Sequence, residues 1–119
     1  MSQSLFERLG GVTGITNIAS DLIDNDVANK ATSPRFINSD IPRMKNAAAT
    51  FIISGTGGPN VYKGKDVLSA HKGMNISPME FMATLDNALD ALKKNNIGQR
   101  EQEEVLYILY SMRSQVVLV

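Results

Sequence analysis

Apolar residues recur at the spacing of an α-helix through most of this sequence, and this periodicity restricts the fold more than any other feature. In the segment 12–27 they stand three or four positions apart and so share one helical face. Its members are Ile15, Ile18, Ala19, Leu22 and Ile23. The only strand-like run, at 116–119, is too isolated to build a sheet. The sequence therefore predicts an all-α fold.

Capping residues and glycines set the expected ends of the helices. Ser4 with Glu7, and Ser77 with Glu80, form capping boxes, and Asp40 is a further N-cap. Glycines at 10–11 and a glycine-rich breaker at 55–60 interrupt the helical pattern. Helices are thus expected at 4–9, 12–27, 41 to the breaker, around position 71, 78–95 and 99–116, with a loop or single turn at 29–39.

Two expectations concern burial. The aspartates of the second segment lie mainly opposite its apolar face, and we expect them in solvent: Asp21, Asp24 and Asp26. The last helix is expected to bury Val105, Leu106, Ile108, Leu109 and Met112.

The composition is typical of one soluble globular domain, expected to span residues 1–119. Apolar residues make up 43% and charged residues 20% of the chain. Twelve basic and twelve acidic residues cancel, which argues against a nucleic-acid or anionic-membrane partner. The sequence has no apolar run long enough to span a membrane, no signal segment, and no cysteine. We expect a cytoplasmic monomer.

The chain contains a single histidine, His71, which is the only strong candidate for a nitrogen or thiolate ligand of a transition metal. On a helix its ring shares a face with Val67, Leu68 and Met74. Such a histidine is a core residue with one internal hydrogen bond, an exposed residue at the edge of the face, or an axial ligand in an apolar cofactor pocket. The local pattern leaves all three open.

The helix that follows Asp40 has an unusually small middle. Its apolar stripe runs through Ile41, Met44, Ala47, Ala48, Phe51 and Ile52. Consecutive alanines stand where a core helix would normally carry a leucine. Either another helix packs closely there, or the helix leaves room for a bulky non-protein group. Phe36, the one large apolar residue of the preceding loop, would fill the core or press on a ligand.

Several motifs in order along the chain resemble the group I truncated haemoglobins, the compact two-over-two globins, most of all the ciliate members. They are Leu5-Phe-Glu-Arg-Leu-Gly-Gly11, Phe36 with Asp40, Phe51, Gly57-Gly-Pro59, Tyr62 with Gly64, Ala70-His71, Phe81 and the closing Val-Val-x-Val run. Each motif is weak alone, but the ordered set covers nearly the whole chain. The resemblance implies a two-over-two helical sandwich around a haem pocket.

The resemblance also implies roles for individual residues. His71 matches the proximal histidine, which binds the iron of haem b, and Phe36 matches the phenylalanine on the haem face. Pocket walls correspond to Phe51, Ile52, Val67, Phe81 and Thr84. Residues placed to reach the haem propionates are Arg43, Lys45 and Tyr62.

On the gas-binding side the chain departs from the family pattern. The family usually holds bound oxygen with a tyrosine on the second helix and glutamines on the third. The matching positions here are Ile23, Met44 and Ala48, and the position of a sixth haem ligand in some members is Ala47. With Leu22 beside them, these residues predict an almost wholly apolar distal pocket.

An apolar pocket has a consequence for gas binding. A hydrogen bond to bound dioxygen contributes roughly 1.5–3 kcal/mol, or about ten-fold or more in off-rate. Its loss weakens oxygen binding far more than carbon monoxide binding. We hypothesise five-coordinate ferrous haem with fast oxygen release, unless Thr84 donates a hydrogen bond or the sulfur of Met44 ligates the iron.

Three functions therefore remain. The first is a haem protein that reversibly binds a diatomic gas (oxygen, carbon monoxide or nitric oxide) and is reduced by an unidentified reductase. The second is a haem-less or sensor-type interaction module that has kept the globin shape. The third is a nitric oxide dioxygenase. Such catalysis normally requires a polar group on the distal side, and the sequence offers none, so we do not favour an enzymatic function.

Overall fold

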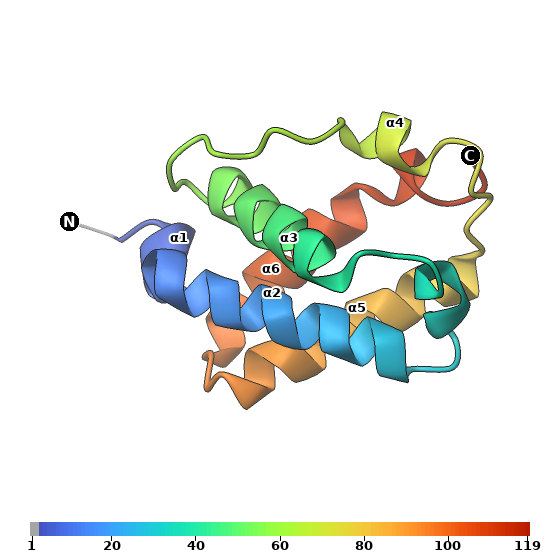
Figure 1. The fold of residues 1–119 in the computed structure, drawn as a ribbon. Coiled ribbons are helices and arrows are strands. Elements are labelled where there is room, and N and C mark those ends of the chain that lie inside the picture. The colour runs from blue at the N-terminus through green and yellow to red at the C-terminus, as the bar shows by residue number, and fades with distance from the viewer. Residues whose placement is uncertain (1–2) are drawn as a thin grey trace.

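The computed structural model describes residues 3–119 and is almost entirely helical (Figure 1). Its elements are α1 (Leu5–Arg8), α2 (Gly11–Ala28), η1 (Ser33–Phe36, a 3-10 turn), α3 (Ile41–Gly55), α4 (Val67–His71), α5 (Pro78–Lys94), α6 (Gln99–Ser111) and η2 (Arg113–Gln115). Within the described range the only strand-type pairing is an isolated parallel bridge between Ile76 and Val117. The all-α prediction is confirmed.

The predicted helix starts are also confirmed. Ser4 and Ser77 both form complete capping boxes, and the Asp40 side chain accepts from the backbone N–H of Arg43. Between α1 and α2 the chain turns so tightly that a side chain at Gly14 would collide with the carbonyl of Leu9. This close approach requires glycine.

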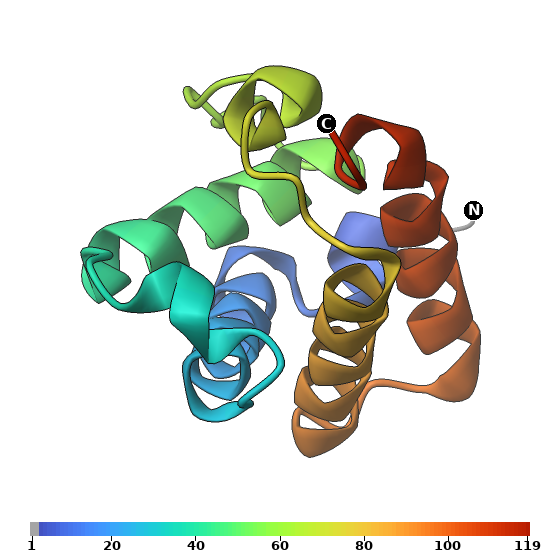
Figure 2. The same cartoon turned by 90° about the vertical axis from the view of Figure 1, so that its right-hand side faces the viewer.

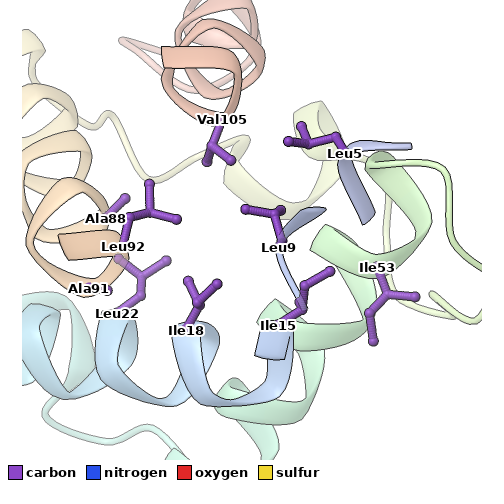
Figure 3. Close-up of a cluster of buried hydrophobic side chains, with 10 residues drawn as sticks. All are labelled: Leu5, Leu9, Ile15, Ile18, Leu22, Ile53, Ala88, Ala91, Leu92 and Val105. Carbon is purple, nitrogen blue, oxygen red and sulfur yellow. The ribbon is translucent and has the colours of Figure 1, made fainter. Parts of the chain in front are cut away.

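The main core lies between α2 and α5, with α1, α3 and α6 closing it (Figure 3). It contains three of the predicted apolar residues of α2 and the C-terminal half of the inner face of α5. Its ten buried side chains point toward one another: Leu5, Leu9, Ile15, Ile18, Leu22, Ile53, Ala88, Ala91, Leu92 and Val105.

A second, smaller cluster joins the start of α5 to the C-terminal segment. Phe81 and Leu85 of α5 are buried against Val116 and Val117, and Val67 of α4 packs on them. The expectation that α6 continues to residue 116 is wrong. The helix ends at Ser111, because the chain leaves helical geometry to bury both consecutive valines and to pair Val117 with Ile76.

Burial corrects three further expectations. On α6 only Val105 is buried, and the other four predicted residues are half-buried. On α3 the buried residues are Ala49 and Ile53, whereas the predicted stripe is half-buried throughout. Asp26 is buried rather than solvated, because it follows Ile23 by three positions and so shares the inner face of α2.

Across residues 3–119, none of the helices combines the length and the apolar character that a membrane crossing requires.

Candidate functional site

The single histidine stands at the end of the short helix α4. Asp66 caps this helix by accepting from the backbone N–H of Ser69. The Nδ1 atom of His71 lies 2.7 Å from the carbonyl oxygen of Val67. Because a carbonyl can only accept, Nδ1 carries a proton, and in the neutral ring Nε2 then keeps its lone pair. This is the arrangement in which a second partner orients a histidine toward a metal.

The segment that follows His71 is held by the end of the chain. The backbone N–H groups of Gly73 and Asn75 both donate to the carbonyl of Val119, at 3.1 and 3.0 Å. Leu118 N–H donates to the carbonyl of Ile76 at 2.8 Å. Together with Val67 on the second cluster, these bonds fix α4 from both ends.

Helix α3 lies between α2 and the segment that carries α4, as both views of the ribbon show (Figures 1 and 2). Ala49 and Ile53 face α2, where they are buried. Helical geometry places Met44, Ala47 and Phe51 on the opposite side, and all three are half-buried. The small apolar face predicted from the sequence is thus turned away from α2, toward the side of His71.

The remaining predicted pocket residues divide between this face and the interior. Leu22 and Ile23 are buried on α2, and Ile52 packs against the main core. Phe51 meets Tyr62 edge to face, with ring centroids 5.2 Å apart. Four more stand around α3 and α4: Ala48 and Phe36, both half-buried, and Val67 and Phe81 in the second cluster.

Two of the three polar residues expected at the pocket mouth have side-chain partners within the protein. Lys45 pairs with Asp24 at 2.8 Å, and the hydroxyl of Tyr62 donates to the carbonyl of Lys65 at 2.7 Å. Arg43 is exposed, and among residues 3–119 its guanidinium makes no ion pair. Arg43 is therefore the residue of this set most open to a carboxylate.

Thr84 belongs to a buried polar network that sequence reasoning missed. Its hydroxyl donates to Asp26 at 3.3 Å, and Asn87 Nδ2 donates to the same carboxylate oxygen at 2.7 Å. Thr32 Oγ1 donates to the carbonyl of Asp26 at 2.7 Å. Burial raises the pKa of Asp26 to about 6, against the opposing hydrogen bonds from Asn87 and Thr84. In the sequence, the sign that Asp26 would be buried was its position three residues after Ile23, on the apolar face of α2.

Arg35 is a second residue that sequence reasoning missed. Its guanidinium binds both carboxylate oxygens of Glu80, at 2.6 and 3.0 Å, and donates to the carbonyl of Met74 at 2.8 Å. Arg35 thereby joins η1, which carries Phe36, to α5 and to the loop after His71. The ion pair with Arg35 lowers the pKa of Glu80 to about 2. Only the tertiary structure brings these residues together.

The donor set can be compared with the kinds of metal site that proteins build. In residues 3–119 there is no group of three or more histidine, cysteine, aspartate or glutamate side chains able to hold a metal ion. A single free imidazole nitrogen beside an apolar helix face instead suits a metal whose other ligands come from a flat organic group. The residues present fit haem.

A family model described as bacterial-like globin matches residues 4–117. The chain belongs to this family. A globin packs its helices around a haem pocket, so this membership makes the protein a haem-binding globin. The resemblance read from the sequence motifs, and the truncated-globin fold that it implied, are confirmed.

This globin has relatives among the group 1 truncated hemoglobins of ciliates. The protein of Tetrahymena pyriformis is 27% identical over 114 residues, covering 96% of this chain and 94% of the relative. That of Tetrahymena thermophila is 29% identical over 97 residues, covering 82% and 80%. The crystal structure of the Tetrahymena pyriformis protein in its Fe(III) form superposes with a TM-score of 0.94 at 26% identity, covering 98% of this chain and all of that one.

More distant structures show the fold alone. The group II truncated hemoglobin of Bacillus anthracis superposes with a TM-score of 0.89 at 21% identity, covering 98% of this globin and 92% of that chain. Crystal structures of the Tetrahymena pyriformis protein also include variants in which a tyrosine is replaced by phenylalanine, and two glutamines, 21 and 25 residues further along, are each replaced by glutamate.

Proposed function

We propose that this globin holds haem b through Nε2 of His71 and reversibly binds a diatomic gas in an apolar distal pocket. The observation that carries the proposal is the hydrogen bond from Nδ1 of His71 to the carbonyl of Val67, which leaves Nε2 as a lone-pair donor. When bound, haem supplies a ferrous iron with an open coordination position for the gas.

Other residues of the chain would seat the cofactor. Phe36, Phe51, Val67 and Phe81 offer apolar surface around α3 and α4, and Arg43 offers an exposed cation to a propionate. The bonds from Gly73 and Asn75 to Val119 would hold the proximal segment in place. We propose that the single chain completes this site without a second subunit.

The three positions that match the family's distal hydrogen-bond donors carry no donor side chain in this chain. Met44 and Ala48 follow Ile23 by 21 and 25 residues, the same spacing as the tyrosine and two glutamines substituted in the Tetrahymena pyriformis protein. This spacing supports the correspondence, and all three side chains here lack an N–H or O–H donor. Thr84 gives its hydroxyl proton to Asp26 and is not free to donate elsewhere.

The absence of donors at Ile23, Met44 and Ala48 determines which gas we expect this globin to retain. A bound dioxygen that gains no hydrogen bond leaves faster, by about ten-fold or more, whereas carbon monoxide depends little on such a bond. We therefore propose weak oxygen retention with low discrimination against carbon monoxide. The thioether of Met44, on the same face as Ala47 and Phe51, is the side chain from which a sixth ligand would come.

The absorption spectrum of haem-reconstituted protein tests the proposal, in the ferric and dithionite-reduced states, beside His71→Ala and a matched Lys72→Ala control. We expect a strong Soret band and a five-coordinate ferrous spectrum in the wild type and the control, and loss of tight haem binding in His71→Ala. A six-coordinate ferrous spectrum would shift the function toward electron transfer. If the wild-type protein fails to take up stoichiometric haem, the proposed haem-binding function is wrong, and the interaction module replaces it.

A further inference from the structure

The zero net charge of this globin conceals an uneven distribution along the chain. Residues 35–75, which include α3, α4 and His71, contain six basic residues and only two acidic ones. Both acidic residues, Asp40 and Asp66, are engaged as N-caps of α3 and α4. The rest of the chain carries the compensating negative charge.

The basic residues of this segment differ in whether they are neutralised. Arg35 pairs with Glu80 and Lys45 with Asp24. Arg43 is exposed on α3, where the proposed function assigns it to a haem propionate. Lys63, Lys65 and Lys72 are exposed, and among the residues from 3 to 119 they make no ion pair. These three lysines, called the lysine edge below, flank α4 on both sides, and Lys72 directly follows His71.

The loop that presents the lysine edge is ordered by its own contacts. The hydroxyl of Ser54 accepts from the backbone N–H groups of Val61 and Tyr62, both at 3.0 Å. The hydroxyl of Tyr62 donates to the carbonyl of Lys65, and a side chain at Gly64 would collide with the Tyr62 ring. The loop and α4 lie on the side of the molecule away from α5 (Figures 1 and 2). The backbone that carries Lys63 and Lys65 is therefore ordered by contacts within the loop itself.

We propose that the lysine edge docks a small acidic one-electron carrier protein that reduces the ferric haem iron. The inference rests on the proposed function, because only the ferrous iron binds oxygen or carbon monoxide. One electron passes from the reduced centre of the carrier to the ferric iron, and the carrier is oxidised by one electron. No atom is transferred. Electron transfer weakens steeply with distance. A carrier that docks on the lysine edge, next to His71, would bring its redox centre close to the haem that His71 would hold.

The size of the lysine edge favours this partner over other anionic ones. Three lysines support electrostatic steering and a brief encounter of the small, wet type common among redox proteins. Attachment to an anionic membrane generally uses clusters of four to eight basic residues. Tight binding to nucleic acid requires neutralising many phosphates, which a chain of zero net charge does poorly.

The test uses a reduced plant-type [2Fe–2S] ferredoxin as the probe and measures reduction of the ferric holoprotein under carbon monoxide by stopped flow. The variant Lys63→Glu/Lys65→Glu is compared with Lys30→Glu/Lys93→Glu, which changes the net charge equally at exposed positions elsewhere. At low salt we expect the first variant to lose roughly ten-fold in second-order rate and most of its salt dependence, while the control keeps both. Equal rates in the two variants would overturn the proposal.

A second readout does not depend on haem chemistry. Titration of ¹⁵N-labelled protein with oxidised ferredoxin should shift the backbone amide signals of residues 60–73 in the wild type and the control, and not in the lysine-edge variant. Binding to phosphatidylserine vesicles in place of ferredoxin would overturn the choice of partner. Dithionite reduction followed by carbon monoxide binding tests the proposed function separately, because it requires no docking.

Discussion

Nδ1 of His71 lies 2.7 Å from the carbonyl oxygen of Val67, one helical turn earlier. This bond decides which ring nitrogen is protonated, and so makes Nε2 the donor. If His71 acts as a ligand and not as a packing residue, free imidazole should replace it. We expect His71→Gly to lose tight haem binding and to regain a five-coordinate spectrum with millimolar imidazole. A variant that retains haem without imidazole would contradict the assignment.

A donor introduced on α3 should restore oxygen retention. In Ala48→Gln the side-chain amide would stand on the half-buried face of α3 and could donate to bound dioxygen. We expect oxygen dissociation to slow by about ten-fold and carbon monoxide dissociation to change far less. Stopped-flow ligand displacement measures both rates, and Ala48→Leu is the control that adds bulk without a donor. Slowing by the leucine as well would indicate a steric cause.

The buried Asp26 makes the stability of the protein depend on pH. Its pKa is raised to about 6, so the folded state holds the proton more tightly than the unfolded chain, where aspartate titrates near 3.8. The resulting stabilisation is full below pH 3.8 and is lost as the pH rises through 6. We expect Asp26→Asn, which keeps an acceptor for Asn87 and Thr84, to stabilise the protein at pH 7 by about 2–3 kcal/mol.

Urea denaturation at pH 5 and pH 7 measures this effect. The gain from Asp26→Asn should be clearly smaller at pH 5, where the wild-type carboxyl is largely protonated. Asp90→Asn, at an exposed position on α5, is the control and should change stability little at either pH. An equal gain at both pH values would show that the burial of charge is not the cause.

The ion pair between Arg35 and Glu80 should matter to both stability and haem retention. Arg35→Ala removes this pair and the bond to the carbonyl of Met74, so we expect a loss of about 1 kcal/mol and faster haem release. Because the pKa of Glu80 is lowered to about 2, the stabilisation is present above pH 4.5 and is lost as the pH falls through 2. Transfer of haem to excess apomyoglobin measures the release, with Arg113→Ala, at an exposed position after α6, as the control.

The sequence by itself determined the features that depend on neighbouring residues. Helix starts follow from a cap and its third neighbour, as at Ser77 and Glu80, and the apolar faces of α2 and α5 follow from periodicity. Its uniqueness made His71 the only strong candidate for a metal ligand, but its local pattern left three roles open, and the resemblance to the family favoured the ligand. The family emerged from motifs in order along the chain.

Tertiary structure alone decided the contacts between residues far apart in the chain. The capping pattern of Glu80 carries no sign of Arg35, 45 residues earlier, and the valines after α6 carry no sign of the loop that follows His71. The face of α2 points Asp26 inward, but the partners that satisfy its buried carboxylate, Asn87 and Thr84, come from another helix. Local patterns follow from short-range backbone geometry, whereas these pairings exist only once packing has brought distant segments together.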